Sequence, residues 1–361
     1  MKKVFCVLLA VSLMAVMIPF VTAANYNGFV YELNDSGTYT ITGYTDFYTE
    51  SVTVPSTISG KAVTAIEQGA FQLKSNIKSV VIPNSVTYIG AMAFYSCKNL
   101  ASVTLGENVK SIGAKAFNTC TSLTSINLKN VEVVGEYAFY GCGNLTDLYC
   151  GEALKVIGKN AFTNCTKLSY IRWSQALIYI DAYAFADCTG ITTITFPDSL
   201  AYIGNSAFKG CLSLSDVTFG RGELQIADYA FENCKALLSV TIPDNVTSIG
   251  HYAFALRESN SNDFSHNITI TCSSFGAGAS YVKLFNVPAI FVDMGSEITI
   301  FGDITGDGII DSNDAIAVLR IAAGLDIEPT AEAFFTIDLN SNGVIDTGDS
   351  QLILKKASGI I

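Results

Sequence analysis

The stretch "NIKSVVIPNSVTYIGAMAFYSC", residues 76–97, is the unit from which most of the chain is built. Its Ala-Phe pair recurs at an interval of 23 residues, once 22. The nine phenylalanines of these pairs are Phe71, Phe94, Phe117, Phe139, Phe162, Phe185, Phe208, Phe231 and Phe254. A unit this short cannot bury its apolar face alone, so the period predicts coils stacked into a repeat solenoid.

Within the unit, Val80 and Ile82 alternate with Ser79 and Val81, which is the period of a half-buried strand. Gly90 supplies a turn into the return limb. Stacked coils lie about 4.8 Å apart, so nine coils would make a rod roughly 40 Å long. We therefore expect a β-rich solenoid with one parallel sheet along one face.

The in-phase copies resemble the BspA-type (treponemal) leucine-rich repeat of bacterial surface and secreted proteins, with its "IGxxAFxxC" core, over residues 45–292. The segment "ITITCSSFGAGASYVKLFNVPAIFV" (268–292) looks like the cap that closes such arrays. Residues 24–50 look like a short β cap at the other end. The resemblance therefore implies a solenoid over residues 51–293, its C-terminal cap included.

Residues 1–23, "MKKVFCVLLAVSLMAVMIPFVTA", have two lysines, an apolar run and a small-residue site, as a secretory signal peptide does. An uncleaved anchor is the alternative, because the run from Val4 to Val21 could just span a bilayer. We expect a secreted, extracellular protein with no membrane insertion after cleavage. The net charge of −11 and the lack of a basic stripe argue against nucleic-acid partners and electrostatic membrane binding.

Seven cysteines each lie three residues after an Ala-Phe phenylalanine: Cys97, Cys120, Cys142, Cys165, Cys188, Cys211 and Cys234. Disulfides are the first interpretation for a secreted protein. In-register side chains point the same way rather than toward each other, however, and seven is an odd number. We favour buried thiols acting as small apolar core residues over disulfides. A metal site is less favoured, because no histidine or CxxC pair accompanies these positions.

The outward strand positions are mostly Ser and Thr, but two adjacent coils differ. They carry Asp147 and Tyr149, then Tyr170 and Arg172, which is an interface-like composition at the middle of a flat surface. Ordinary cross-strand pairing of an exposed sheet is the alternative. Trp173 takes an inward position and should be buried. These four residues are the candidate ligand-binding patch.

The sequence shows no catalytic constellation. It has two histidines, and no GxSxG, HExxH or glycine-rich phosphate loop is present. We therefore expect a protein that is not an enzyme.

Residues 302–361 hold ten acidic and three basic residues and contain two similar loops, "DITGDGIIDSND" (303–314) and "DLNSNGVIDTGD" (338–349). Calcium takes six or seven oxygens from alternate positions of such a bent loop. The expected ligands are Asp303, Thr305, Asp307, the carbonyl of Ile309, Asp311 and Asp314, then Asp338, Asn340, Asn342, the carbonyl of Val344, Asp346 and Asp349. Each loop runs into an apolar helix, so we expect two structural calcium ions in a small all-α domain.

An EF-hand pair would have a helix before each loop and Glu at position 12. Here position 12 is Asp in both loops, and "GSEITIFG" before the first loop does not look helical. The pattern instead resembles a type I dockerin over residues 302–361, which leaves 294–301 as a linker. The resemblance implies a partner, the cohesin module of a scaffoldin. The matching contact positions are Ser312, Asn313, Arg320, Thr347, Gly348 and Lys355.

Two departures from the dockerin pattern matter. Thr305 is a weaker ligand than the usual Asn or Asp, and the unlike pairs Ser-Asn and Thr-Gly put a symmetric, two-orientation module in doubt. The sequence as a whole predicts a non-catalytic adhesion protein whose solenoid binds a protein or polysaccharide and whose dockerin attaches it to a cell-surface cellulosome. The alternative is an enzyme-associated or inhibitory subunit of a polysaccharide-degrading complex.

Overall fold

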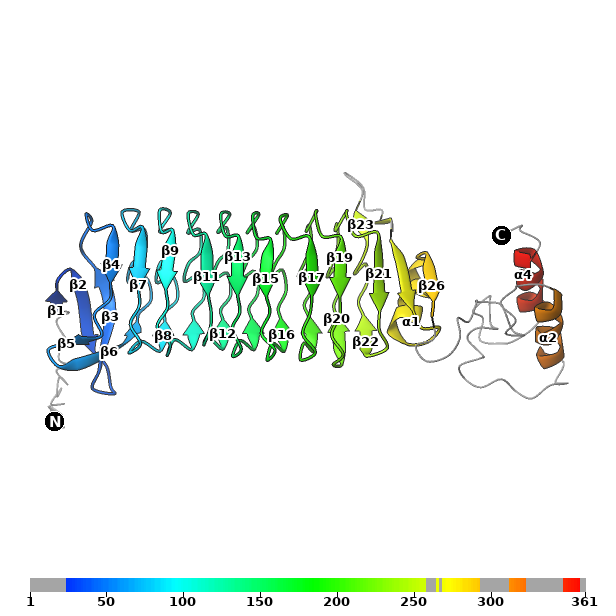
Figure 1. Ribbon diagram of the computed structural model, residues 1–361, viewed down its shortest axis with the longest axis horizontal. Coiled ribbons are helices and arrows are strands. Elements are labelled where there is room, and N and C mark those ends of the chain that lie inside the picture. The colour runs from blue at the N-terminus through cyan, green and yellow to red at the C-terminus, as the bar shows by residue number, and fades with distance from the viewer. Residues whose placement is uncertain (1–23, 258–263, 266–267, 293–311, 323–346, 358–361) are drawn as a thin grey trace, which may run out of the picture.

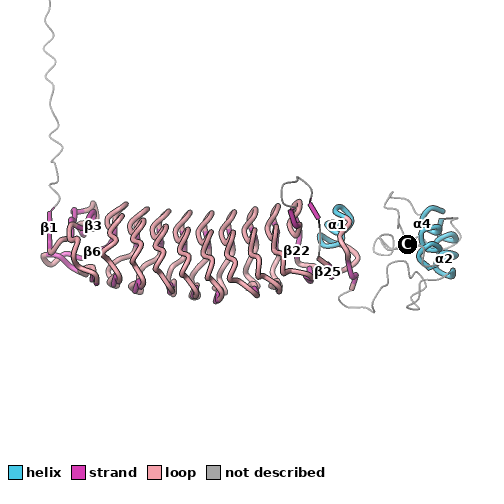
Figure 2. Tube along the Cα trace, turned by 90° about the horizontal axis from the view of Figure 1, so that it is seen from above, coloured by secondary structure: helices cyan, strands magenta, loops and turns pink. Residues whose placement is uncertain are grey.

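The computed structural model describes residues 24–257, 264–265, 268–292, 312–322 and 347–357. The repeats stack into a long rod in which each coil follows the one before it (Figures 1 and 2). The predicted repeat solenoid with parallel strands is confirmed.

The first face of the rod carries the predicted strands, one from each coil. Its strands are β4 (Ser51–Thr53), β7 (Ser79–Val81), β9 (Ser102–Thr104), β11 (Ser125–Asn127), β13 (Asp147–Tyr149), β15 (Tyr170–Arg172), β17 (Thr193–Thr195), β19 (Asp216–Thr218), β21 (Ser239–Ile242), β25 (Thr269–Cys272) and β26 (Ala289–Phe291). The neighbours pair in parallel and in register within short groups, such as β4-β7-β9. Val80 and Ile82 are each 1% exposed, as their alternation predicted.

A second parallel sheet runs along the return limbs. It contains β6 (Lys61–Ile66), β8 (Tyr88–Ile89), β10 (Ser111–Ile112), β12 (Val133–Val134), β14 (Val156–Ile157), β16 (Tyr179–Ile180), β18 (Tyr202–Ile203), β20 (Leu224–Ile226) and β22 (Val246–Ile249). The expectation of one parallel sheet is therefore wrong. Most of these strands have only two residues, too few to show an alternating pattern in the sequence, and they pair because the stacked coils bring them together.

Both ends of the rod carry irregular elements. At the N-terminal end, β1 (Ala24–Tyr26), β2 (Phe29–Leu33) and β3 (Tyr39–Tyr44) form an antiparallel meander, and β5 (Thr57–Ile58) pairs with β6. At the other end, β23 (Leu256–Arg257) pairs with β24 (Phe264–Ser265). Helix α1 (Gly276–Phe285) covers the last coil, where the hydroxyl of Tyr281 accepts a hydrogen bond from the Phe254 N–H at 3.1 Å. These elements cover apolar surface that another coil would otherwise bury.

The nine Ala-Phe phenylalanines form one continuous column through the core. From Phe71 to Phe254 their ring centroids lie 4.9 to 5.3 Å apart, with interplanar angles of 2° to 8°. Each ring is at most 3% exposed. Because the repeats are in register, the one phenylalanine that each coil contributes stacks on the next to form a continuous aromatic core.

The cysteines form a second column beside the phenylalanines. Each of the seven thiols donates a hydrogen bond to the phenylalanine carbonyl one coil earlier, as Cys97 does to Phe71 at 3.0 Å and Cys188 to Phe162 at 3.1 Å. All nine cysteines in the described part of the chain are free and buried. The prediction of buried thiols is confirmed.

The thiols should resist alkylation in the folded protein. Burial raises the pKa of the Cys142 thiol, and of the Cys97 thiol, to about 12, so almost no reactive thiolate is present at neutral pH. For the chain without residues 1–23, which contain Cys6, we expect no labelling by iodoacetamide at pH 8 under native conditions and nine labels after denaturation in urea, both counted by mass spectrometry. Labelling of the native protein, or fewer than nine labels after unfolding, would contradict the buried-thiol column.

Two helices follow the two acidic loops near the C-terminus. Helices α2 (Ser312–Ala322) and α4 (Thr347–Ala357) pack against each other through Ala315, Val318 and Ile353, all at most 2% exposed. The Ser350 hydroxyl donates a hydrogen bond to the Ala315 carbonyl at 3.1 Å. The rest of both loops, residues 303–311 and 338–346, lies outside the described residues.

Candidate ligand-binding site

The predicted patch residues lie on two neighbouring strands of the first face. Asp147 pairs with Tyr170, and Tyr149 pairs with Arg172, across β13 and β15. The rings of Tyr149 and Tyr170 lie 5.8 Å apart at 57°, and the side chains are 38% and 50% exposed. The stacking of coils thus brings together aromatic and cationic groups that lie 23 residues apart in the sequence.

These side chains border a hollow, not the flat surface that the sequence led us to expect. The hollow has a volume of about 630 Å³. We call it the tyrosine recess; it is lined by Asn127, Lys129, Asn130, Tyr149, Gly151, Glu152, Tyr170, Ile171, Arg172, Trp173, Gln175 and Thr195. Asp147 is not among the lining residues, and its Oδ2 accepts a hydrogen bond from the Thr146 hydroxyl at 2.6 Å.

The Trp173 indole fixes the inner wall of the tyrosine recess. Trp173 is 9% exposed and its ring packs edge-on against Phe185 of the aromatic column, with centroids 5.5 Å apart. The predicted burial of Trp173 is confirmed. Because its ring is held by the core, this wall is rigid before any ligand arrives.

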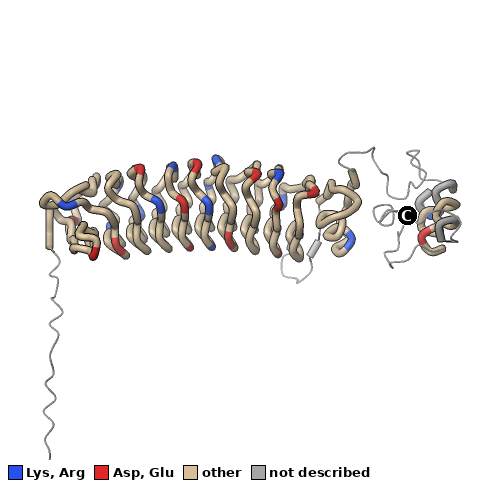
Figure 3. The backbone as a smooth tube through the Cα atoms, turned by 90° about the horizontal axis from the view of Figure 1, so that it is seen from below, with Lys and Arg blue, Asp and Glu red and all other residues tan. Residues whose placement is uncertain are grey.

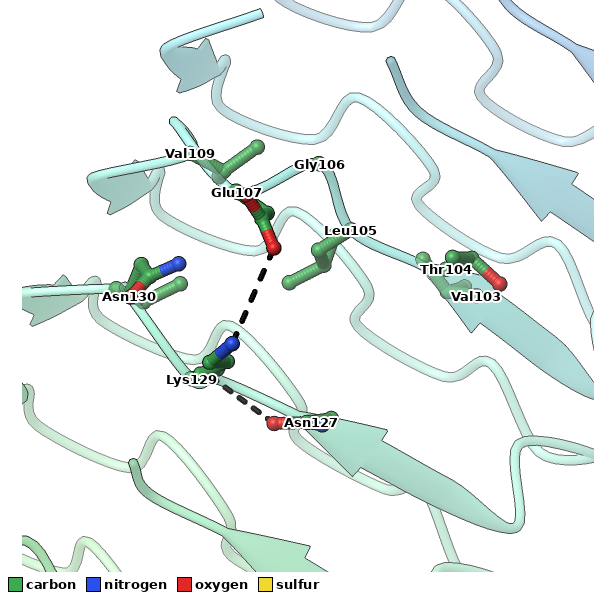
Figure 4. Close-up of a pocket in the computed structure, with 10 residues that line it drawn as sticks. Val103, Thr104, Leu105, Gly106, Glu107, Val109, Asn127, Lys129 and Asn130 are labelled. Carbon is green, nitrogen blue, oxygen red and sulfur yellow. Dashed lines mark hydrogen bonds and ion pairs between the residues drawn. The ribbon is translucent and has the colours of Figure 1, made fainter. Parts of the chain in front are cut away.

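A second hollow lies on the other side of the loop after β11. It has a volume of about 310 Å³ and shares Asn127, Lys129 and Asn130 with the tyrosine recess. We call it the lysine hollow; its lining is completed by Val103, Thr104, Leu105, Gly106, Glu107, Val109 and Val131. Figure 4 shows the Lys129 side chain directed toward Glu107, with the two charged atoms 3.9 Å apart.

The single 22-residue interval shortens the loop that separates the two hollows. Only two residues, Lys129 and Asn130, separate Leu128 from Val131, whereas three separate Leu105 from Val109 in the preceding coil. The missing residue removes bulk from the wall between the two hollows. A side chain at Gly151, where φ is +64°, would overlap the Lys129 carbonyl oxygen, so glycine allows the next coil to close against the short loop.

The charge around the tyrosine recess differs from that of the chain as a whole. Lys129 and Arg172 line it with one acid, Glu152, while the chain carries a net charge of −11. Figure 3 shows acidic and basic residues interspersed along the rest of the rod. The side chains of Lys129 and Glu107 are 70% and 68% exposed, so their ion pair contributes little and leaves Lys129 available to a ligand.

Sequence reasoning found the two tyrosines and the arginine but missed the lysine and amides beside them. Asn127 occupies an outward strand position, and Lys129, Asn130 and Gln175 belong to the following loops. The signal that could have found them is the 22-residue interval itself. A one-residue deletion in an otherwise regular repeat shows which loop differs in length from the equivalent loops of neighbouring coils.

Among the residues that the structure describes, no group of three or more His, Cys, Asp and Glu is placed to hold a metal ion. Within those same ranges, no helix is long and apolar enough to cross a membrane.

The C-terminal candidate residues are described in part. Ser312, Thr347 and Lys355 are exposed on α2 and α4, Gly348 is half-buried, and Asp349 is fully buried in the first turn of α4. Asn313, Asp314 and Arg320 belong to α2. The other predicted calcium ligands lie outside the described residues: Asp303, Thr305, Asp307, Ile309, Asp311, Asp338, Asn340, Asn342, Val344 and Asp346.

The period, the parallel strand ladders and the columns of core residues together define a leucine-rich repeat protein. The family described as the BspA type leucine rich repeat region matches residues 64–192 and 178–298, in 6 copies. These matches cover well over half of the chain, which belongs to the BspA-type leucine-rich repeat family. The family predicted from the "IGxxAFxxC" core is confirmed.

Of two similar proteins with solved structures, the first supports the same fold. A leucine rich cell surface protein from Faecalibacterium prausnitzii is 28% identical over 64% of this chain and 73% of its own, with a TM-score of 0.55. A leucine-rich repeat protein from T. pallidum is 24% identical over 60% of this chain and 91% of its own, with a TM-score of 0.45. A comparison with curated proteins returned no match.

Proposed function

We propose that this chain is a secreted, non-catalytic recognition protein of the bacterial surface, and that the tyrosine recess binds its ligand. The observation that carries the proposal is that Tyr149, Tyr170 and Arg172 line one hollow on a face otherwise dominated by Ser and Thr. The similar protein from Faecalibacterium prausnitzii is described as a cell surface protein, which supports this location.

The physical argument rests on residue type and rigidity. Tyrosine and arginine supply a large share of the binding energy in many interfaces. Here they stand on paired strands whose inward residues, Leu148 and Ile171, pack against the core. A site held in place before binding loses little conformational entropy when the ligand arrives.

Replacing Tyr149, Tyr170 and Arg172 by alanine together should abolish ligand binding by the solenoid without unfolding it. All three side chains are exposed, so their loss leaves the core intact. The measurement is retention of the full chain on immobilised polysaccharides and secreted proteins, with folding checked by circular dichroism. The matched control replaces Thr193, Thr218 and Thr241 by alanine, which lie on the same face outside both hollows, and should keep binding. Undiminished binding by the first triple variant would refute the assignment of the site.

We also propose that residues 302–361 form a calcium-folded dockerin that attaches the chain to a cohesin of a cellulosomal scaffoldin. The twin acidic loops support this, as do the two helices that follow them. Asp349, at position 12 of the second loop, is buried, as a ligand of an enclosed ion would be. Two calcium ions would neutralise the aspartates that crowd each loop.

Exposed residues of the helix pair fit a role in docking. Ser312, Thr347 and Lys355 are exposed, and Ile316 and Leu319 on α2 are 53% and 40% exposed. Apolar side chains one turn apart on a helix form a stripe that a partner can cover. The dockerin resemblance makes a cohesin that partner.

Chelating calcium with EDTA should unfold residues 302–361 and leave the solenoid intact, because metal binding adds its free energy to folding. We expect cohesin binding to disappear and the helical circular dichroism signal to fall to that of α1 in the solenoid, while the β signal remains. Adding back calcium, but not magnesium, should restore both, since magnesium demands a tighter octahedral site. Helical signal and cohesin binding unchanged in EDTA would contradict the calcium-folded module.

A further inference from the structure

We propose that the tyrosine recess and the lysine hollow together bind a sugar chain that carries carboxylate groups. This inference rests on the proposed ligand-binding role of the recess and names the chemical class of its ligand. The two hollows share Asn127, Lys129 and Asn130, so one chain ligand can occupy both.

Two cations of the lining, Lys129 and Arg172, can each meet an anionic group of a ligand. Lys129 and Arg172 lie two coils apart, about 10 Å along the rod at the usual strand spacing. The planar guanidinium of Arg172 can donate two parallel hydrogen bonds to a carboxylate, and Lys129 adds a second point charge. A chain with carboxylates on successive units meets both cations. Two acids, Glu107 in the lysine hollow and Glu152 in the tyrosine recess, disfavour ligands with very dense negative charge.

The remaining lining suits hydroxyl groups and sugar rings. The side-chain amides of Asn127, Asn130 and Gln175 each offer donors and an acceptor, which matches ligand hydroxyls that are themselves donors and acceptors. Tyr149 and Tyr170 add apolar ring surface and phenolic hydroxyls, both half-exposed. This mixture of amides, tyrosine and arginine fits a sugar acid better than it fits an apolar molecule.

A peptide ligand is disfavoured by the position of the hollows. An extended peptide gains affinity by pairing with the unpaired edge of a sheet. Strand β13, at the centre of the recess, is already paired with β11 on one side and β15 on the other. A large protein partner would need an apolar interface core. The outward residues of the neighbouring coils, such as Ser125 and Thr193, are small and polar.

The test compares a short oligogalacturonate with its methyl ester, which has the same backbone without the charges. Isothermal titration with the full chain at low ionic strength should give at least tenfold tighter binding of the free acid, weakening as salt rises. Arg172→Ala and Lys129→Ala should each lower the affinity for the acid about tenfold, because each removes a charged contact. Arg221→Ala, in the loop after β19 and outside both hollows, is the matched control and should bind as the unaltered chain does.

Three results would overturn the inference: no binding of the oligogalacturonate, equal affinity for acid and ester, or affinity unchanged in both Arg172→Ala and Lys129→Ala. Failure of the underlying proposed function looks different. In that case binding of whatever ligand the chain takes survives the triple replacement of Tyr149, Tyr170 and Arg172. A third outcome combines two results: the triple variant loses binding to neutral polysaccharides, and the unaltered chain binds acid and ester equally. That outcome would retain the site and reject its selectivity for charged ligands.

Discussion

Replacing Phe162 by alanine should lower the free energy of unfolding of the solenoid by about 3–5 kcal/mol. The Phe162 ring stacks on Phe139 at 5.1 Å and on Phe185 at 5.2 Å, and it is fully buried. Its loss leaves a cavity at the middle of the aromatic column. Because each coil contacts only its neighbours, the weakened interface should also uncouple the two halves of the rod.

Urea unfolding followed by circular dichroism measures this effect. We expect a lower midpoint and a transition that broadens or splits in two, whereas the unaltered chain unfolds over a narrower range. The control is Leu238→Ala, which removes a 56% exposed side chain and should change stability by less than about 0.5 kcal/mol. If the two variants unfold alike, the phenylalanine column does not hold the coils together.

Replacing Lys209 by alanine should cost about 3 kcal/mol, because it leaves Glu232 buried without its cation. The Lys209 ammonium lies 2.7 Å from Glu232 Oε2, and the Glu232 side chain is 2% exposed. Among the described residues, Glu232 Oε1 has no hydrogen-bond partner. We place the cost at the low end for a broken buried pair, because the Lys209 side chain is 33% exposed and water reaches the site.

A matched control and a rescue variant show whether the loss of stability comes from the burial of Glu232 or from the loss of an ion pair as such. Lys155→Ala breaks the pair with Glu132, whose charged atoms lie 3.3 Å apart on side chains 52% and 39% exposed, and should cost less than about 1 kcal/mol. The double variant Lys209→Met with Glu232→Met removes both charges and should recover most of the loss. Equal losses in Lys209→Ala and Lys155→Ala, measured by urea unfolding, would show that burial of Glu232 does not set the cost.

Much of the solenoid could be predicted because the repeat imposes the same environment on equivalent residues. The 23-residue interval predicted stacked coils that bury their apolar faces together, and Phe94 and its equivalents lie in that core. The alternation around Val80 predicted which strand residues face inward. The second sheet could not be predicted. Tyr88–Ile89 and its equivalents are too short to show a period, and they become strands only when coils stack.

The candidate site was predictable in part. Outward positions follow from the strand period, so Tyr149, Tyr170 and Arg172 could be identified and placed on adjacent strands. The hollow beside them depends on how the loop after β11, which is one residue shorter, fits between the loops of neighbouring coils. The residue pattern of a single strand carries no information on this fit. Lys129 joins the site for this reason, although it lies 43 residues from Arg172 in the chain.

The sequence by itself determined that this protein is a stacked BspA-type array with a stacked phenylalanine column, because each repeat must use its neighbours to bury the same apolar residues. The tertiary structure decided that the array has parallel strands on two faces and that its first face is hollowed on both sides of Lys129. Both depend on contacts between coils. Whether two coils form a backbone hydrogen bond, or leave a cavity beside a shortened loop, depends on the distance between residues about 23 positions apart. No local sequence pattern encodes that distance.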